Sequence, residues 1–289
     1  MTAIASTAPL RARRWQRRFT INARTVALAL FCAVWIYPFV WLLSASLKAP
    51  LGIFSKGLSL WPDSPQWSNY SQAWDQAGFS HYMLNSVVIT AGTVLLVTFR
   101  SALAGYVLGR FSFPGKKLLI IVLIATFFLP EGYTIVPITQ LSHQLHLLNS
   151  RLGIILGLGA GGQVPATLLF AAYFRTLPKE LDEAATVDGA GPLRIFFRVM
   201  LPLAKPVTWT VILLQFLHAW NAFLLPLVFT LGQESLRTLA VGMVVFQGDD
   251  YTNYSALAAA AVIALAPVVV LFVVLQKHFV DAVAGAVKQ

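Results

Sequence analysis

The sequence predicts an all-α integral membrane protein with six membrane-spanning helices and both termini on the cytoplasmic side. The 289-residue chain is 57% hydrophobic and only 11% charged, whereas a soluble domain averages about 25% charged residues. Six apolar segments are each near or above the roughly 20 residues that cross a bilayer as a helix. They cover about residues 26–43, 83–109, 117–143, 151–174, 206–231 and 255–276.

The distribution of lysine and arginine predicts the orientation. With the N-terminus inside, 16 of the 21 Lys and Arg residues fall in cytoplasmic segments: six in residues 1–24, three in 110–117, five in 175–205 and two near the C-terminus. Cytoplasmic loops of membrane proteins carry this excess. The net charge of +10 is therefore explained by topology, and we expect no nucleic-acid partner.

The domain organisation follows from the same pattern. We expect a basic cytoplasmic tail over 1–24, a transmembrane domain over 25–277 and a cytoplasmic C-terminal tail over 278–289. The first apolar run, about 18 residues long, exceeds the apolar core of a signal peptide and is followed by further spans, which favours an uncleaved helix. The single cysteine, Cys32, excludes a disulfide framework and a cysteine metal cluster.

The segment 178–202, called the 178–202 loop below, is a polar island between two apolar segments. Pro178 suits the first turn of a helix, and acidic residues suit the positive end of a helix dipole; these are Glu180, Asp182 and Glu183. Gly189 tolerates the left-handed conformation that ends a helix, and Pro192 suits the start of another. The prediction is a helix, a glycine turn and a second helix along the membrane face.

Residues within the 178–202 loop carry a family resemblance. Glu183-Ala184-Ala185 and Asp188-Gly189-Ala190, with Val199-Met200-Leu201-Pro202 beginning ten residues after Gly189, resemble the EAA loop of bacterial ABC importer permeases. Further matches point to the carbohydrate-uptake branch of these permeases, in particular its six-span maltose-system type. They include Asn85-Ser86, Ala104-Gly105-Tyr106, Arg110-Phe111, Leu147-Leu148-Asn149-Ser150 and Trp220-Asn221.

The resemblance implies a type I ABC importer permease fold in the bacterial inner membrane. It implies a second homologous permease, two ATP-binding cassette ATPase subunits and an extracellular or periplasmic substrate-binding protein as partners. The coupling helix that docks on the ATPase would carry Glu183, Ala184, Ala185, Asp188, Gly189 and Ala190. An outer loop over about 232–254 would contact the binding protein.

The chain itself lacks the patterns of an ATPase or another enzyme. Gly115-Lys116 has neither a glycine five positions earlier nor a Ser or Thr after it, so it is not a P-loop. No nucleophile with a base and no pair of acids stands out. We therefore expect no cofactor in this chain, with ATP and Mg²⁺ bound by partner subunits.

Polar residues inside membrane spans are costly and mark pathway candidates. The candidates for the pathway or its gating are Asn85, Arg100, Glu131, Gln215, His218 and Asn221. Amide side chains suit a hydroxyl-rich solute, but polar residues in bundles also hydrogen-bond one helix to another. Pro130, Gly132 and Pro137 predict a kink in the third span.

Arg100 leaves three interpretations open. It pairs with Glu131 across the interior, or it faces the pathway and accepts an anionic solute, or it lies at a subunit interface with its charge snorkelling toward water. The resemblance as a whole points to a sugar importer permease. The alternatives are an importer permease for a polyamine or a glycerol phosphodiester, and a proton-coupled secondary transporter that uses Glu131.

Overall fold

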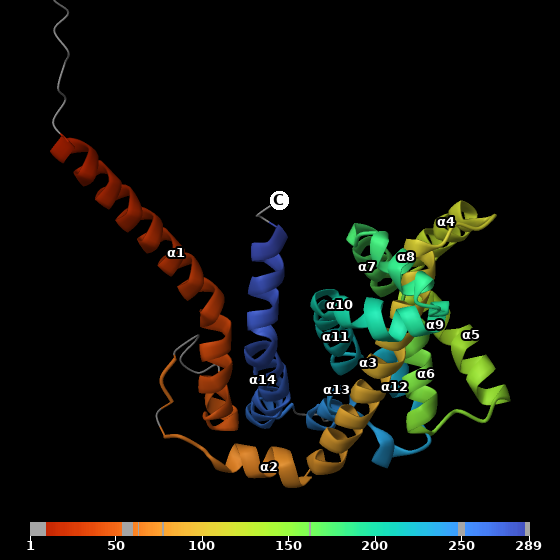
Figure 1. The fold of residues 1–289 in the computed structure, drawn as a ribbon. Helices are drawn as coiled ribbons and strands as arrows, with labels where there is room; N and C mark the ends of the chain where they lie inside the picture. The colour runs from red at the N-terminus through yellow and green to blue at the C-terminus, as the bar shows by residue number, and fades with distance from the viewer. Residues whose placement is uncertain are drawn as a thin grey trace, which may run out of the picture. The chain divides into compact units, whose positions relative to one another are not determined.

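The computed structural model describes residues 10–53, 60–62, 64–76, 78–161, 163–247 and 252–286. Regular structure in these ranges is helical, apart from one isolated bridge between Gln247 and Thr252, which confirms the predicted all-α class for the described residues (Figure 1). The chain divides into two compact units, one of Met1–Tyr70 with Asn253–Val262 and the other of Ser71–Thr252 with Ile263–Gln289.

The first unit contains a long, mostly unburied helix. Helix α1 (Leu10–Ser46) has 37 residues, and its apolar side chains from Val26 to Val40 are largely exposed. Its end is fixed by Asn69, whose Nδ2 donates to the carbonyls of Ser46 and Lys48, both at 2.9 Å. Because such an apolar helix gains nothing from exposure to water, lipid or another chain must cover it.

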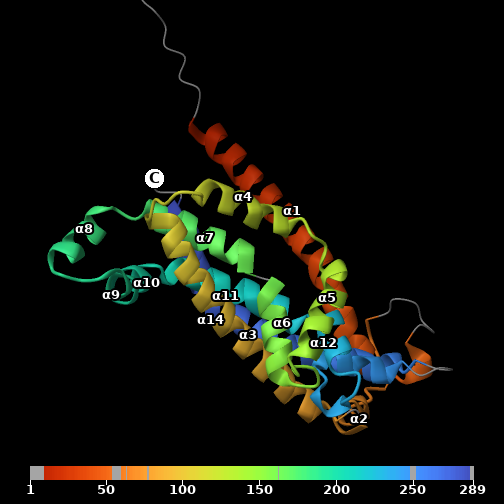
Figure 2. The ribbon, with the colours of Figure 1, turned by 90° about the vertical axis from the view of Figure 1, so that its right-hand side faces the viewer.

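Helix α3 (Phe79–Arg110) lies at the centre of the second unit. It packs against α7, α11 and α6, as Figure 2 shows. Their bounds, with those of the remaining helices, are α2 Ser68–Gln76, α4 Lys116–Phe127, α5 Glu131–Gln144, α6 Arg151–Gly161, α7 Gln163–Thr176, α11 Lys205–Trp220, α12 Leu224–Phe229, α13 Leu239–Gly242 and α14 Tyr254–Ala286. The short turns η1, η3 and η4 cover Pro50–Gly52, Glu234–Leu236 and Met243–Phe246.

Glycines let α7 approach α3 closely. A Cβ atom on Gly105 would lie 2.4 Å from Cβ of Phe170, and one on Gly109 would lie 2.9 Å from Cβ of Phe174. The two phenylalanines belong to a buried cluster with Tyr106 of α3. Small residues at a helix contact allow this approach and increase van der Waals packing in a membrane, where no hydrophobic force joins helices.

Several predicted spans are bent or broken. In the third span, Lys116–Phe127 and Gly132–Gln144 meet at 104°, and Pro130 lies at the N-cap of α5, so the predicted kink is a full break between two helices. The fourth span consists of Arg151–Ala160 and Gln163–Thr176 at 56°. Proline disfavours the helical conformation in the residue before it, which accounts for the break at Pro130.

The fifth predicted span, 206–231, is also not one helix. Helix α11 ends at Trp220 and α12 begins at Leu224. Pro226 lacks an N–H and its ring would clash with the carbonyl of Ala222 in a continuous helix. The carbonyl of Leu217 accepts from both the backbone amide of Asn221 at 3.2 Å and its side-chain amide at 2.8 Å, which marks the end of α11.

Within the described residues, three helices are individually long and apolar enough to cross a membrane. They are Arg24–Ser46, Phe79–Arg110 and Tyr254–Gln276. If each of three bent helix pairs counts as one span, the number rises to six by length and composition. The expected polar segment 48–80 also contains helix α2, and α14 continues into the expected C-terminal tail as far as Ala286.

Candidate functional site: the 178–202 loop

The 178–202 loop begins with the predicted helix and glycine turn. Helix α8 (Glu180–Val187) has three acidic residues in its first turn; Pro178 precedes its cap residue, Lys179, rather than lying in that turn. Gly189 has φ +75°, and the amides of Gly189 and Ala190 donate to the carbonyls of Thr186 and Ala185 at 2.9 and 3.0 Å. These bonds satisfy carbonyls that the helix end leaves without a partner.

The second half of the 178–202 loop is a helix with a widened turn. Pro192 starts α9 (Pro192–Ile195), and a π-helical stretch, η2 (Phe196–Met200), leads into α10 (Leu201–Leu203). Pro202 explains the widening, because in a regular α-helix its ring would clash with the carbonyl of Arg198. The segment Pro192–Leu203 then meets Lys205–Trp220 at 80°, so the loop lies across the direction of α11.

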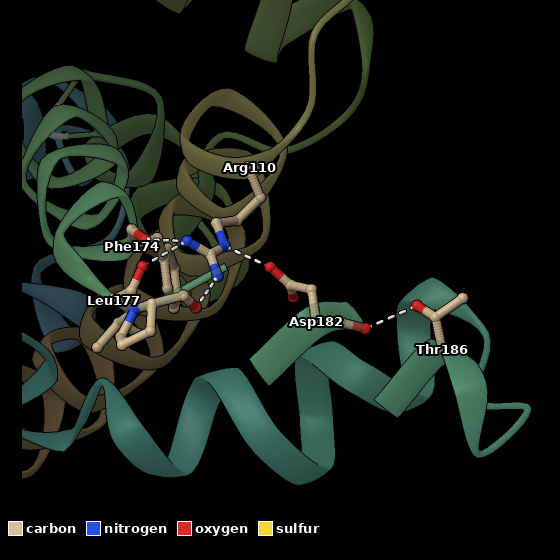
Figure 3. A network of polar contacts seen from close by, with 6 residues as sticks. Arg110, Phe174, Leu177, Asp182 and Thr186 are labelled. Carbon is tan, nitrogen blue, oxygen red and sulfur yellow. Dashed lines mark hydrogen bonds and ion pairs between the residues drawn. The ribbon is translucent and has the colours of Figure 1, made fainter. Parts of the chain in front are cut away.

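Arg110, the last residue of α3, anchors the 178–202 loop (Figure 3). Its Nε donates to Oδ2 of Asp182 at 2.5 Å. Its terminal nitrogens donate to three backbone carbonyls at the end of α7, those of Phe174 (3.1 Å), Leu177 (2.7 Å) and Pro178 (2.6 Å). One guanidinium therefore joins the end of α3, the end of α7 and the first turn of α8.

The environment of Arg110 strengthens this anchor. Its side chain is 6% exposed and that of Asp182 is 26% exposed, so the charges are screened less than a surface pair. The carbonyls at the end of α7 are the negative end of a helix dipole, which favours a cation. Thr186 extends the network by donating from Oγ1 to the carbonyl of Asp182 at 2.7 Å.

Helix α8 has two different faces. Leu181, Ala185 and Ala190 pack against the buried cluster that contains Tyr106, Phe174 and Phe196. On the outside, Val187 of α8 is 87% exposed, and Leu193 of the following helix α9 is 64% exposed. Figure 2 shows α8 and α9 standing out beyond α3, α7 and α11.

The residues predicted to couple to an ATPase divide between these two faces. Four are exposed and two are half-buried; the exposed ones are Glu183, Ala184, Asp188 and Gly189, and the half-buried ones are Ala185 and Ala190. The half-buried alanines contact the core of the subunit. The arrangement presents a small, mixed apolar and acidic surface on a support that is bound tightly to the spans.

Three of the predicted pathway residues lie along one side of α11. Gln215 and His218 line a cavity of about 620 Å³ that is also lined by residues of α4, α5 and α7, among them Thr126, Thr134 and Gln163. His218 and Asn221 line a second cavity of about 360 Å³. The spacing of three residues places successive side chains near one face of a helix, so the structure brings these candidates together.

The other three pathway candidates lie elsewhere. Asn85 is fully buried, donates to the carbonyls of Ser235 (2.8 Å) and Arg237 (3.0 Å), and accepts from Nε of Arg151 (2.9 Å). This set of bonds favours the structural alternative for Asn85. Arg100 donates to the carbonyl of Gly159 at 2.6 Å. The side chain of Glu131 lies outside the described residues, so the Arg100–Glu131 pair stays a prediction.

Sequence reasoning missed the anchor. In the sequence, Arg110 is part of a motif at a helix end, and Asp182 is one of three acids in a first turn. The pair is separated by 72 positions, and no local pattern indicates such a contact. Among the described residues, no group of three or more His, Cys, Asp or Glu side chains could hold a metal ion.

Comparisons with known proteins identify the family of this chain. Residues 1–285 match the family described as "Binding-protein-dependent transport system inner membrane component". The chain belongs to this family. Its members are membrane-embedded transport permeases rather than enzymes, and the resemblance to ABC importer permeases drawn from the sequence is confirmed.

Two relatives are identical to this chain at over a third of the aligned positions. The diacetylchitobiose uptake system permease protein NgcG of Streptomyces coelicolor is 37% identical over 276 residues, covering 94% of this chain and 89% of that protein. The melibiose/raffinose/stachyose import permease protein MelC of Bacillus subtilis is 35% identical over 275 residues, covering 94% and 96%.

The fold also matches a solved structure. A chain from the crystal structure of a bacterial ABC transporter involved in the import of the acidic polysaccharide alginate superimposes with a TM-score of 0.78. The match covers 96% of this chain and 100% of the other, at 23% sequence identity. This likeness shows that the two chains share a fold.

Proposed function

We propose that this permease forms half of the pathway of an ATP-driven importer for a sugar or sugar-like solute, and that a separate ATPase moves it through the exposed face of α8. The names of relatives support the solute class, since NgcG is named for diacetylchitobiose and MelC for melibiose, raffinose and stachyose. A second permease would supply the other half of the pathway, and a substrate-binding protein would deliver the solute from outside.

The proposed topology has six spans in the bacterial inner membrane. Each bent helix pair counts as one span, which gives six with α1, α3 and the start of α14. The excess of Lys and Arg in alternate segments favours cytoplasmic termini. In this orientation Arg110 and the 178–202 loop lie on the cytoplasmic side, where an ATPase operates.

The observation that carries the coupling proposal is the two-faced α8. Its inner face packs on the spans and Arg110 ties its first turn to α3 and α7, so a push on α8 moves the spans instead of deforming the loop. Its outer face exposes Val187 and Glu183 beside the small residue Ala184, which allows close approach of a partner surface. Exposed apolar side chains rimmed by polar ones mark protein interaction sites.

The proposed pathway passes the α11 cavities. A cavity of about 620 Å³ lies within the usual size of small-molecule sites, which combine an apolar lining with a few placed polar groups. Gln215, His218 and Asn221 supply amide and imidazole groups for hydroxyls. The broken third span forms another wall of both cavities, through Thr134 and Ile138, and its two halves offer a place for gating motion.

The test is uptake by the complete importer in proteoliposomes with ATP inside. We expect Gly189→Pro to abolish uptake, because proline fixes φ near about −65° and Gly189 requires +75°. Glu183→Lys should do the same by reversing a charge on the docking face. Gly191→Ala is the control, since Gly191 has φ −73° and open space around its Cβ position.

Two results would contradict the proposal. One is normal uptake and normal ATPase coupling in the Gly189→Pro or Glu183→Lys complex. The other is uptake that survives ATP depletion but is abolished by an uncoupler, which would favour a proton-coupled carrier. In each case the amount of the chain in the membrane is measured, so that loss of protein is not taken for loss of transport.

A further inference from the structure

Helix α3 holds a different loop at each of its ends. At the N-terminal end, Asn85 donates to the carbonyls of Ser235 and Arg237, and Oγ of Ser86 accepts from the amide of Leu239 at 2.8 Å. These contacts hold the 232–242 segment, which contains η3 and α13. At the C-terminal end, Arg110 holds the 178–202 loop.

The anchoring side chains near the two ends of α3 are largely shielded from water. Asn85 is 0% exposed and Ser86 is 2% exposed, and the Arg110 side chain is 6% exposed. The two N–H groups of the Asn85 amide each have an acceptor, and its oxygen has a donor. Breaking such a buried set leaves polar groups without partners, which costs more than a hydrogen bond at a surface.

The stretch between the two ends is continuous helix. From Asn85 to Arg110 the distance along the axis is about 38 Å at 1.5 Å per residue, more than the roughly 30 Å of the hydrocarbon core. No proline interrupts it, and its contact with α7 at Gly105 and Gly109 admits no added Cβ without displacement of a neighbour. Close packing of this kind has low compressibility and transmits strain.

We propose that α3 is a rod that transmits movement between the 178–202 loop and the 232–242 segment, with Arg110 and Asn85 as the positioning residues at its ends. The proposal rests on the proposed function, which puts the ATPase at one end and the binding protein at the other. ATP-driven displacement of α8 reaches the outer segment through Arg110, α3 and Asn85. By linkage, displacement of the outer segment reaches α8 by the same route.

The polypeptide chain also connects the 178–202 loop to α12, through α10 and α11. Movement of α12 therefore serves as an internal reference for movement that reaches the 232–242 segment through α3. A label at Leu224, an exposed residue that starts α12, reports on the route through α11. A label at Gln233, an exposed residue of the 232–242 segment that follows α12 in the chain, lies beyond both routes, so a loss of response there with the Leu224 response retained reports on the α3 route. Loss of transmission through α3 lowers the response at Gln233 alone, whereas a general loss of motion lowers the responses of both labels.

The experiment uses the complete importer in lipid nanodiscs, with Cys32→Ser and one spin label at Gln233→Cys or Leu224→Cys. The stimulus is Mg-ATP with vanadate. In the otherwise unchanged chain, we expect the spectrum of each spin label to change when Mg-ATP and vanadate are added; this change is the response of the label. In Arg110→Lys, which keeps the charge but loses the planar fork, the response at Gln233 should fall about fivefold or more, the lower end of usual site-to-site coupling, while the response at Leu224 persists.

Four further variants complete the test. Arg175→Lys, the same exchange at an exposed position in the last turn of α7, should leave both responses unchanged. If Arg110→Lys does not assemble, Asp182→Asn removes one contact of the guanidinium and should lower the Gln233 response in the same selective way.

At the other end of α3, Asn85→Leu should abolish the Gln233 response as well. Thr90→Val should not, since the buried Thr90 hydroxyl has no hydrogen-bond partner among the described residues.

A full response at Gln233 in an assembled Arg110→Lys or Asp182→Asn complex contradicts the proposal that α3 transmits the movement. Equal loss at Gln233 and Leu224 also overturns it, because the anchor then only holds the 178–202 loop in place. Failure of the proposed function looks different: neither label responds to ATP in the chain with Arg110 intact.

Discussion

Arg110 holds three helix ends together because of the chemistry of its guanidinium. The group presents five N–H donors in a planar fork, and four bonds to it join Asp182 and three carbonyls of the α7 end. A lysine has three donors on one nitrogen and cannot reach acceptors in these separate directions. Position 110 therefore requires the planar guanidinium of arginine and not only a positive charge.

We expect Arg110→Lys to loosen the 178–202 loop. Hydrogen bonds with a charged partner contribute about 1.5–3 kcal/mol each, and losing one such bond raises the population of the opened loop about tenfold or more. Limited trypsin cleavage at Lys179 and Arg194 should speed up by this factor, while Arg175→Lys leaves the rate unchanged. Equal cleavage rates in the two variants would show that the anchor does not restrain the loop.

Local sequence signals predict the turn of the 178–202 loop but not its anchor. Gly189 and Pro192 act through their own backbone preferences, so their roles follow from neighbours in the chain. The Arg110–Asp182 pair depends on where α3 and α7 end in space, which no local pattern contains. Asn85 shows the same limit, since a polar residue in a span does not reveal its partner.

At the scale of elements, the central feature is the contact of α3 with α7. The glycines at 105 and 109 remove the Cβ atoms that would hold the helices apart, and aromatic rings fill the space beside them. Tyr106 lies with its ring centroid 5.7 Å from that of Phe174 and 5.4 Å from that of Phe196. The same cluster thus connects the spans to the 178–202 loop.

Gly105→Ala tests this contact. The added methyl group would lie 2.4 Å from Cβ of Phe170 and 2.9 Å from the amide nitrogen of Ala171, and overpacking of this kind costs about 1–3 kcal/mol. The melting temperature in detergent should fall by several degrees. Gly132→Ala in α5, where nothing lies within 4 Å of the Cβ position, should leave it unchanged or raise it slightly; equal effects would contradict the close packing.

The apolar pattern locates the elements better than it locates their breaks. Each of the six predicted apolar segments contains helix, since apolar length alone identifies a segment that can cross lipid. Pro130 signals the break of the third span. The break of the fifth span at Asn221 depends on Pro226, five residues on, and the bend of the fourth span after Ala160 likewise precedes a proline, Pro165, whose ring would clash with the carbonyl of Gly161 in a continuous helix.

At the scale of the whole molecule, the chain has the features of one subunit of a larger complex. It exposes a long apolar face on α1, holds cavities beside α11, and presents a small anchored surface at α8. Its sequence contains no P-loop, and in the proposed function the energy for transport arrives through a contact with an ATPase subunit. The structure of α8 makes it the site that suits this contact.

The most direct measurement is cross-linking from α8 in the assembled importer. A chain with Cys32→Ser and Val187→Cys carries a photoreactive thiol label, with Gln233→Cys as the matched control. We expect a cross-linked product between the label at position 187 and the ATPase subunit, and none from the label at position 233. The account is contradicted if the thiol at position 187 reacts with a membrane-impermeant reagent from outside the cell, or if its label forms no product with the ATPase in a transport-active complex.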